Sequence, residues 1–141
     1  LFLIFKEVII NMGLDMYLYG VISKYNLHDY NIGNIRTFVE IGYWRKSNQI
    51  HKWFVDNIQG GVDNCATYYC DKEQLIKLKI LCEQVLDDPK QAEELLPVKE
   101  GFFFGSEEYD EWYFSDLQET IEIIDWAISK EYDYFAYSSS W

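Results

Sequence analysis

The sequence predicts an α+β fold, with about three main helices packed on a small and mainly antiparallel sheet. Apolar and polar residues alternate in segments rich in aromatic side chains, which is typical of strands with one buried face. Other segments repeat apolar residues every three or four positions, as helices that pack on a sheet do. The chain has 141 residues, of which 49% are hydrophobic, so a single domain can bury one core.

Four segments are predicted to form the strands of the sheet. In the clearest, residues 14–23, Leu14, Met16 and Leu18 fall on one face and Asp15 and Tyr17 on the other. A stretch at residues 35–41 fits either a short strand or an irregular lead into the following helix. The predicted strands are residues 14–23, 65–70, 102–104 and 132–138.

Helical spacing of apolar residues predicts the three main helices. The first covers residues 43–55 and continues to the glycine pair at 60 and 61, where flexible residues end it. The second begins after Asp71, which has the character of an N-cap with Gln74 in the first turn. A short helix is predicted over residues 90–96, and the third main helix over about residues 110–129.

The net charge of −12 is unevenly distributed along the chain. From Gly61 to Trp141 the sequence has six Lys or Arg residues against nineteen Asp or Glu residues, a balance of −13. Direct binding of this acidic half to nucleic acid is unfavourable, and it could instead meet a basic partner, including the basic groove of a nucleic-acid enzyme. The alternative is that the acidic residues only maintain solubility.

Cysteine and histidine usage predicts no metal and no cofactor. Three cysteines occur without a CxxC motif, and with two histidines they form no zinc-binding pattern. Cys65 and Cys70 are predicted on opposite faces of one strand, so they are not expected to pair with each other. The reducing cytoplasm is therefore the expected compartment.

The first eleven residues are expected to contribute nothing to function. Residues 1–10 are apolar, but Lys6 and Glu7 interrupt them and they are too short to cross a membrane. We expect the natural protein to start at Met12, or translation to begin at a non-standard codon read as Leu1. The functional domain is then residues 12–141.

The segment of residues 43–55 combines aromatic, cationic, amide and imidazole groups more densely than any other. An aromatic ring there could stack on a base while Arg45 binds a phosphate, which would make a nucleotide-binding site. The alternative is that Arg45 and Lys46 form ion pairs within the protein, with carboxylates such as Asp110 and Glu111. The candidate ligand-binding residues are Trp44, Arg45, Lys46, Asn48, His51, Ser106, Tyr109 and Asp110.

A second dense segment, residues 101–113, starts with three phenylalanines between glycines and continues into an acidic, aromatic helix start. Acidic and aromatic side chains together could occupy a basic channel of another protein. The negative charge would speed association with that protein, and the aromatic side chains would supply binding affinity. The candidate partner-binding residues are Glu107, Glu108, Glu111, Trp112, Tyr132 and Tyr134.

Catalysis is not the expected activity. The sequence contains no nucleophile elbow, no phosphate-binding loop and no metalloprotease motif. His51 could act with Asp110 or Glu111 as an acid–base pair, but a lone histidine on a helix is more often structural. Nucleophilic chemistry by Cys65 or Cys70 with His51 is weaker still, because no third group orients such a pair.

Three sequence motifs stand out: Met12-Gly-Leu-Asp-Met-Tyr-Leu, the Tyr43-Trp-Arg-Lys-x-Asn-x-Ile-His-x-Trp-Phe-Val stretch, and Gly101-Phe-Phe-Phe-Gly-Ser-x-x-Tyr-Asp-Glu-Trp-Tyr. Together they resemble a family of small uncharacterised proteins from phages, prophages and other bacterial mobile elements. The resemblance extends from Met12 to about Ile128. It implies an accessory gene of a mobile element, and many such genes act on host defence, for example as anti-CRISPR inhibitors. That step is an analogy.

The expected function is therefore binding without catalysis. The hypothesised partner is a host protein, such as a nucleic-acid-binding defence enzyme, reached through the acidic aromatic surface. The alternative is a protein that sequesters a nucleotide or phosphate with Arg45, Asn48 and His51.

Overall fold

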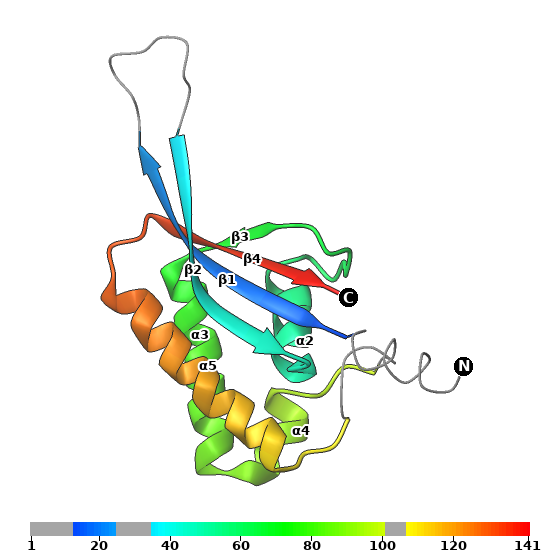
Figure 1. Cartoon of the computed structure of the whole chain (residues 1–141). Coiled ribbons are helices and arrows are strands. Elements are labelled where there is room, and N and C mark those ends of the chain that lie inside the picture. The colour runs from blue at the N-terminus through cyan, green and yellow to red at the C-terminus, as the bar shows by residue number, and fades with distance from the viewer. Residues whose placement is uncertain (1–12, 25–34, 101–106) are drawn as a thin grey trace, which may run out of the picture.

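The computed structural model describes residues 13–24, 35–100 and 107–141, which form a four-stranded antiparallel sheet with helices packed on one face (Figure 1). The strand order is β2-β1-β4-β3, so the first and last long strands are neighbours in the centre. This arrangement confirms the α+β prediction. The predicted strand at residues 102–104 lies outside the described residues.

The hairpin of β1 (Asp15–Lys24) and β2 (Ile35–Arg45) forms half of the sheet. Alternation works as predicted at the start of β1, since Met16 and Leu18 are fully buried while Tyr17 and Tyr19 lie on the other face. The register shifts between Leu18 and Tyr19, whose partners are Gly42 and Glu40, so β2 has one extra residue there. Figure 1 shows the hairpin extending beyond the helical layer.

The predicted helix at residues 43–55 is wrong in its first part. Tyr43 and Trp44 belong to β2, where they pair with Tyr17 and Met16. Lys46 then takes a left-handed backbone conformation with φ of 55° and turns the chain into α2 (Asn48–Asn57). Gly42 and Trp44 are buried while Tyr43 is exposed, which is the alternation of a strand. The prediction missed it because this alternation covers only three residues and a longer helical pattern follows directly.

The other edge of the sheet is formed by β3 (Tyr68–Cys70) and β4 (Tyr134–Ser140). Both strands begin later than the predicted segments at 65–70 and 132–138. Asp133 precedes β4 and accepts a hydrogen bond from the Ser23 amide at 2.7 Å, which fixes the turn into the strand. Cys65, Cys70 and Cys82 are free, as expected.

The helices α3 (Lys72–Asp87) and α5 (Glu111–Ser129) form the main helical layer, with η1 (Pro89–Gln91) and α4 (Ala92–Leu95) between them in the chain. Asp71 and Gln74 form the predicted capping box of α3, and Asp110 accepts from the Tyr113 amide as the N-cap of α5. Gly42 lets α5 approach the sheet closely, because a Cβ there would lie 2.5 Å from Cγ2 of Ile123.

An aromatic cluster joins the helices to the sheet. Phe54 of α2 stacks on Tyr137 of β4 with ring centroids 3.8 Å apart, and the Trp44 ring lies 6.2 Å from Phe54. The Trp44 indole donates to Oγ1 of Thr120 on α5 at 2.9 Å. Among the described residues, no helix combines the length and apolar character needed to cross a membrane.

Candidate functional site

The structure separates the candidate ligand-binding residues of the first dense segment. Trp44 is buried with 1% exposure and serves the core, and Asn48 is buried at the first position of α2. Arg45 lies on the opposite, outer face of the sheet, where its guanidinium pairs with Asp15 at 2.7 Å. Burial alone would raise the pKa of Asp15, but hydrogen bonds from Tyr43 and Arg45 outweigh it and lower that pKa.

His51 is fully buried and both of its ring nitrogens have partners. Nδ1 lies 2.7 Å from the Tyr137 hydroxyl, and Nε2 lies 3.0 Å from both carboxylate oxygens of Asp63. Burial lowers the pKa of His51, although Asp63 acts in the opposite direction. We therefore assign a neutral ring in which Nε2–H donates to Asp63 and Nδ1 accepts from Tyr137.

Asp63 is half-buried and connects His51 to residues nearer the surface. It accepts from the Trp141 indole at 3.1 Å, and the Lys99 ammonium lies 3.7 Å away. The network therefore ties α2, the loop after it and the end of the chain together. Nothing in the sequence indicated Asp63 or Tyr137 as partners of His51, because one lies in an irregular loop and the other at an apolar strand position. His51 is therefore placed as a structural residue, because its ring is buried and both ring nitrogens already have partners.

Lys46 does meet the second dense segment. With Asp110 and Trp112 it lines a cavity of about 40 Å³ between the start of α2 and the start of α5. That volume has room for water molecules but is far below the roughly 300 Å³ or more typical of small-molecule sites. The complete lining is Lys46, Gln49, Glu108, Asp110, Trp112, Tyr113 and Asp116.

Asp116 at this cavity has a perturbed carboxyl group. Burial raises its pKa to about 6, although the neighbouring Ser47 and Gln49 side chains act in the opposite direction. A folded-state pKa above the unfolded value of 3.8 stabilises the protein at low pH, and this stabilisation is lost as pH rises through 6. At neutral pH the ionised Asp116 is therefore a destabilising group.

We expect Asp116→Asn to raise the free energy of unfolding at pH 7.5 by about 1 kcal/mol, after allowance for partial solvent screening. The gain should shrink toward zero as the pH is lowered to about 4, where the native carboxyl is protonated in the folded protein. Urea unfolding at both pH values measures it. Glu122→Gln, at an exposed position on the same helix, is the control and should change stability by less than about 0.5 kcal/mol. A gain independent of pH would contradict the assignment.

The remaining candidates fall into two places. Tyr109 is half-buried and its hydroxyl accepts from the Val98 amide at 3.3 Å. Tyr132 and Tyr134 are also half-buried and lie beyond the other end of α5, with Tyr132 against Gly20 and Tyr134 edge-on to Tyr69 at 5.5 Å. The exposed residues at the start of α5 are Glu107, Glu108, Glu111 and Trp112. Ser106 lies outside the described residues.

An exposed face of α5 continues from this acidic start along the helix. Trp112 is 71% exposed and Trp126 is 55% exposed, and Ser115, Glu119 and Glu122 lie between them at spacings of three and four. This spacing places all five on one side of the helix, and we call them the α5 stripe. Burial, with the neighbouring Glu122, raises the pKa of Glu119. Of this stripe only Trp112 is predicted from the sequence, because an aromatic such as Trp126 at helical spacing resembles a core position.

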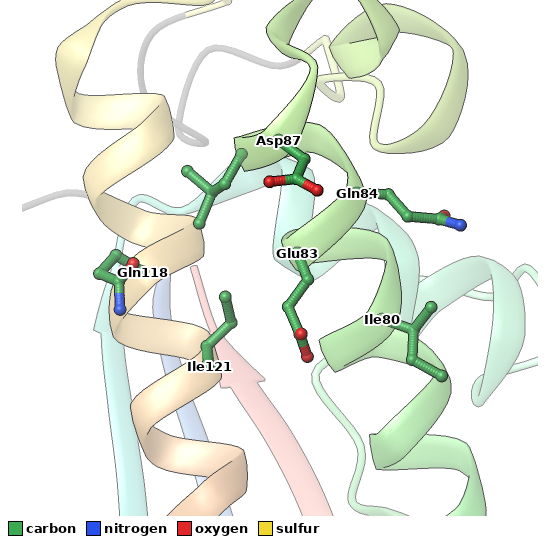
Figure 2. A pocket seen from close by; sticks show the side chains of 7 residues that line it. Ile80, Glu83, Gln84, Asp87, Gln118 and Ile121 are labelled. Carbon is green, nitrogen blue, oxygen red and sulfur yellow. The ribbon is translucent and has the colours of Figure 1, made fainter.

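A groove of about 420 Å³ between α3 and α5 borders the α5 stripe. Figure 2 shows Glu83 and Asp87 of α3 beside the groove and Ile121 of α5 across from them. Gln118 connects the two surfaces, because it lines the groove and precedes Glu122 by one helical turn. The complete lining is Ile80, Glu83, Gln84, Leu86, Asp87, Gln118 and Ile121.

The described residues contain no group of His, Cys, Asp and Glu side chains arranged to hold a metal ion. Burial also raises the pKa of the Cys70 and Cys82 thiols to about 12, so neither is a nucleophile near neutral pH. The chain matches no protein-family model, no curated protein and no solved structure with which it was compared.

Proposed function

We propose that this protein is a non-catalytic binding protein that docks a basic helical segment of another protein on the α5 stripe and the adjoining groove. The observation that carries the proposal is the pair of exposed tryptophans, Trp112 and Trp126, with Glu119 and Glu122 between them. Large exposed aromatics are the side chains that most often anchor interfaces. Over its length α5 has five acidic residues and no Lys or Arg.

The spacing of the tryptophans supports a helical partner. Fourteen residues separate Trp112 from Trp126, which corresponds to about 21 Å along the helix. A partner helix of similar length could place an apolar residue against each ring and lysine or arginine side chains against the carboxylates. Glu83 and Asp87 at the groove extend the acidic surface beyond α5. Charge would speed encounter, and the rings would supply most of the affinity.

The geometry favours this surface over a nucleotide pocket. Arg45 is on the outer sheet face and paired with Asp15, whereas Asn48 and His51 are buried beneath the sheet. The cavity beside Lys46 is about 40 Å³, too small for a nucleotide. These residues therefore support stability and local geometry better than ligand binding.

The resemblance to mobile-element proteins suggests which kind of protein the partner is. The partner is then a basic, nucleic-acid-binding defence enzyme of a bacterial host, and the acidic surface competes with nucleic acid for it. An acidic protein with net charge −12 fits a competitor of this kind. The choice of a defence enzyme rests on the resemblance, whereas the basic character of the partner rests on α5.

Fluorescence anisotropy with a labelled helical peptide tests the surface. The probe is a peptide of about 18 residues, built from lysine and leucine with leucines spaced to face both tryptophans. We expect Trp112→Ala and Trp126→Ala each to weaken binding at least about tenfold. Tyr69→Ala removes an aromatic with 48% exposure on another element and should leave the affinity unchanged. Equal loss in all three variants, or no binding to the native protein, would refute the proposed surface.

A further inference from the structure

Among the described residues, no strand pairs with the outer side of β2, which is an edge of the sheet. In the described sheet β2 pairs only with β1, and its first six residues, 35–40, are all exposed. This part lies before the bulge opposite Leu18 and contains neither proline nor lysine. Natural edge strands usually carry such features because they prevent pairing with another strand. The free edge of β2 is therefore suited to strand addition.

Apolar side chains accompany this free edge on both faces. Ile35, Phe38 and Val39 are 44%, 43% and 39% exposed. Phe38 makes an edge-to-face contact with Tyr19 on the neighbouring strand, with ring centroids 6.2 Å apart. A further strand beside β2 would cover these side chains as well as satisfy the backbone.

The charge of this hairpin differs from that of the rest of the molecule. β1 and β2 together contain three basic residues, Lys24, Arg36 and Arg45, against two acidic residues, Asp15 and Glu40. The whole chain has a net charge of −12. Two copies of so acidic a protein repel each other least where the surface is not acidic. The β1–β2 hairpin provides such a surface.

We propose that β2 pairs antiparallel with β2 of a second copy, about a twofold axis at Phe38. This register places Arg36 opposite Glu40 of the other copy twice, and Phe38 opposite Phe38. Arg36, Phe38 and Glu40 lie on the same face of the sheet. Their partners in β1 are Ser23, Val21 and Tyr19, which are alternate residues of that strand. Opposite charges and paired aromatics directly across strands both stabilise antiparallel pairs.

No neighbouring register has the same complementarity. Moving the axis by one residue to Val39 places Phe38 opposite Glu40 and Arg36 opposite Gly42. Moving it to Thr37 places Arg36 opposite Phe38. Each shift loses both ion pairs, so the charges select a single arrangement.

Arg36 has a contact in the monomer that the dimer would replace. Its Nη1 lies 3.4 Å from the Tyr69 hydroxyl, and its guanidinium carbon lies 5.7 Å from the centre of that ring. The hydrogen bond is long and both residues are exposed. Exchange of this contact for the Glu40 carboxylate of the second copy is therefore a small rearrangement.

A charge swap tests the proposed dimer, with sedimentation equilibrium of the full chain as the measurement. We expect a reversible dimer, weakened at least about tenfold by Arg36→Glu or by Glu40→Arg, because each places like charges opposite each other. The double variant Arg36→Glu with Glu40→Arg restores both pairs and should return the dissociation constant to within about threefold of the native value. Thermal unfolding of each variant shows that it is folded.

Lys77→Glu and Glu73→Arg make the same charge changes at exposed positions of α3 and should not change dimerisation. A protein that stays monomeric up to about 200 µM would overturn the proposal. So would a double variant as weak as the single ones. A monomer that instead binds an unrelated β-strand peptide would assign this edge to a foreign partner and equally exclude the self-paired dimer.

Discussion

His51→Leu is expected to lower the free energy of unfolding at pH 7.5 by about 2 to 4 kcal/mol. The substitution places an apolar side chain of similar size in the fully buried position and removes the acceptor of the Tyr137 hydroxyl and one donor to Asp63. A buried hydroxyl without a partner costs about 1 to 3 kcal/mol, and a lost hydrogen bond to a charged group adds to it. Urea unfolding of the native protein and the variant measures the difference.

The same variant should also lose part of the pH dependence of stability. Burial lowers the pKa of His51 in the folded protein below 6.5, so the unfolded chain binds a proton there more readily than the native state does. The native protein should therefore lose stability as the pH falls below 6.5, and His51→Leu should lack this contribution. Tyr137→Phe, which removes only the hydroxyl, should cost about 1 kcal/mol and keep the slope. An unchanged slope in His51→Leu would show that the histidine is not the group that titrates.

Phe54→Ala is expected to lower the free energy of unfolding by about 3 to 5 kcal/mol, because it leaves a cavity at the junction of helix and sheet. Phe54 is fully buried, stacks on Tyr137 and makes an edge-to-face contact with Trp53 at 5.1 Å. Removal of its ring therefore deprives several aromatic neighbours of contacts at once. Unfolding in guanidinium chloride, followed by tryptophan fluorescence, gives the change in midpoint.

Val62→Ala provides the comparison for the core substitution. Val62 is 53% exposed in the loop after α2, and its truncation should cost less than about 0.5 kcal/mol. If Phe54→Ala were as mild as this control, α2 would not be held to the sheet by the aromatic cluster.

Several elements could be placed from sequence because the forces that form them are local. Asp71 and Gln74 cap α3 through side chains three residues apart, as predicted, and the predicted start of the last helix near Asp110 agrees with α5. Met16 and Leu18 in β1 show a period that only a strand with one buried face produces. Neighbours in the sequence are also neighbours in space in these elements, so spacing alone is informative.

The role of the first dense segment could not be read in the same way. Residues 43–48 contain the end of a strand, a left-handed turn at Lys46 and the start of a helix. All three features fall within a stretch shorter than two helical turns. Pairing with β1 decides where the strand ends, and this pairing joins residues about 28 positions apart, such as Met16 and Trp44. Periodicity in a short window does not contain that information.

The sequence by itself determined the α+β class, the Asp71 cap of α3, the acidic character of the second half and the absence of a recognised catalytic motif. Only the tertiary structure decided that Arg45 and His51 lie on different sides of the sheet and that Asp63 and Tyr137 surround the histidine. It also decided that Trp112 and Trp126 are exposed while Trp44 and Trp53 are buried. The physical reason is that burial depends on which surfaces meet, and distant segments of the chain supply those surfaces.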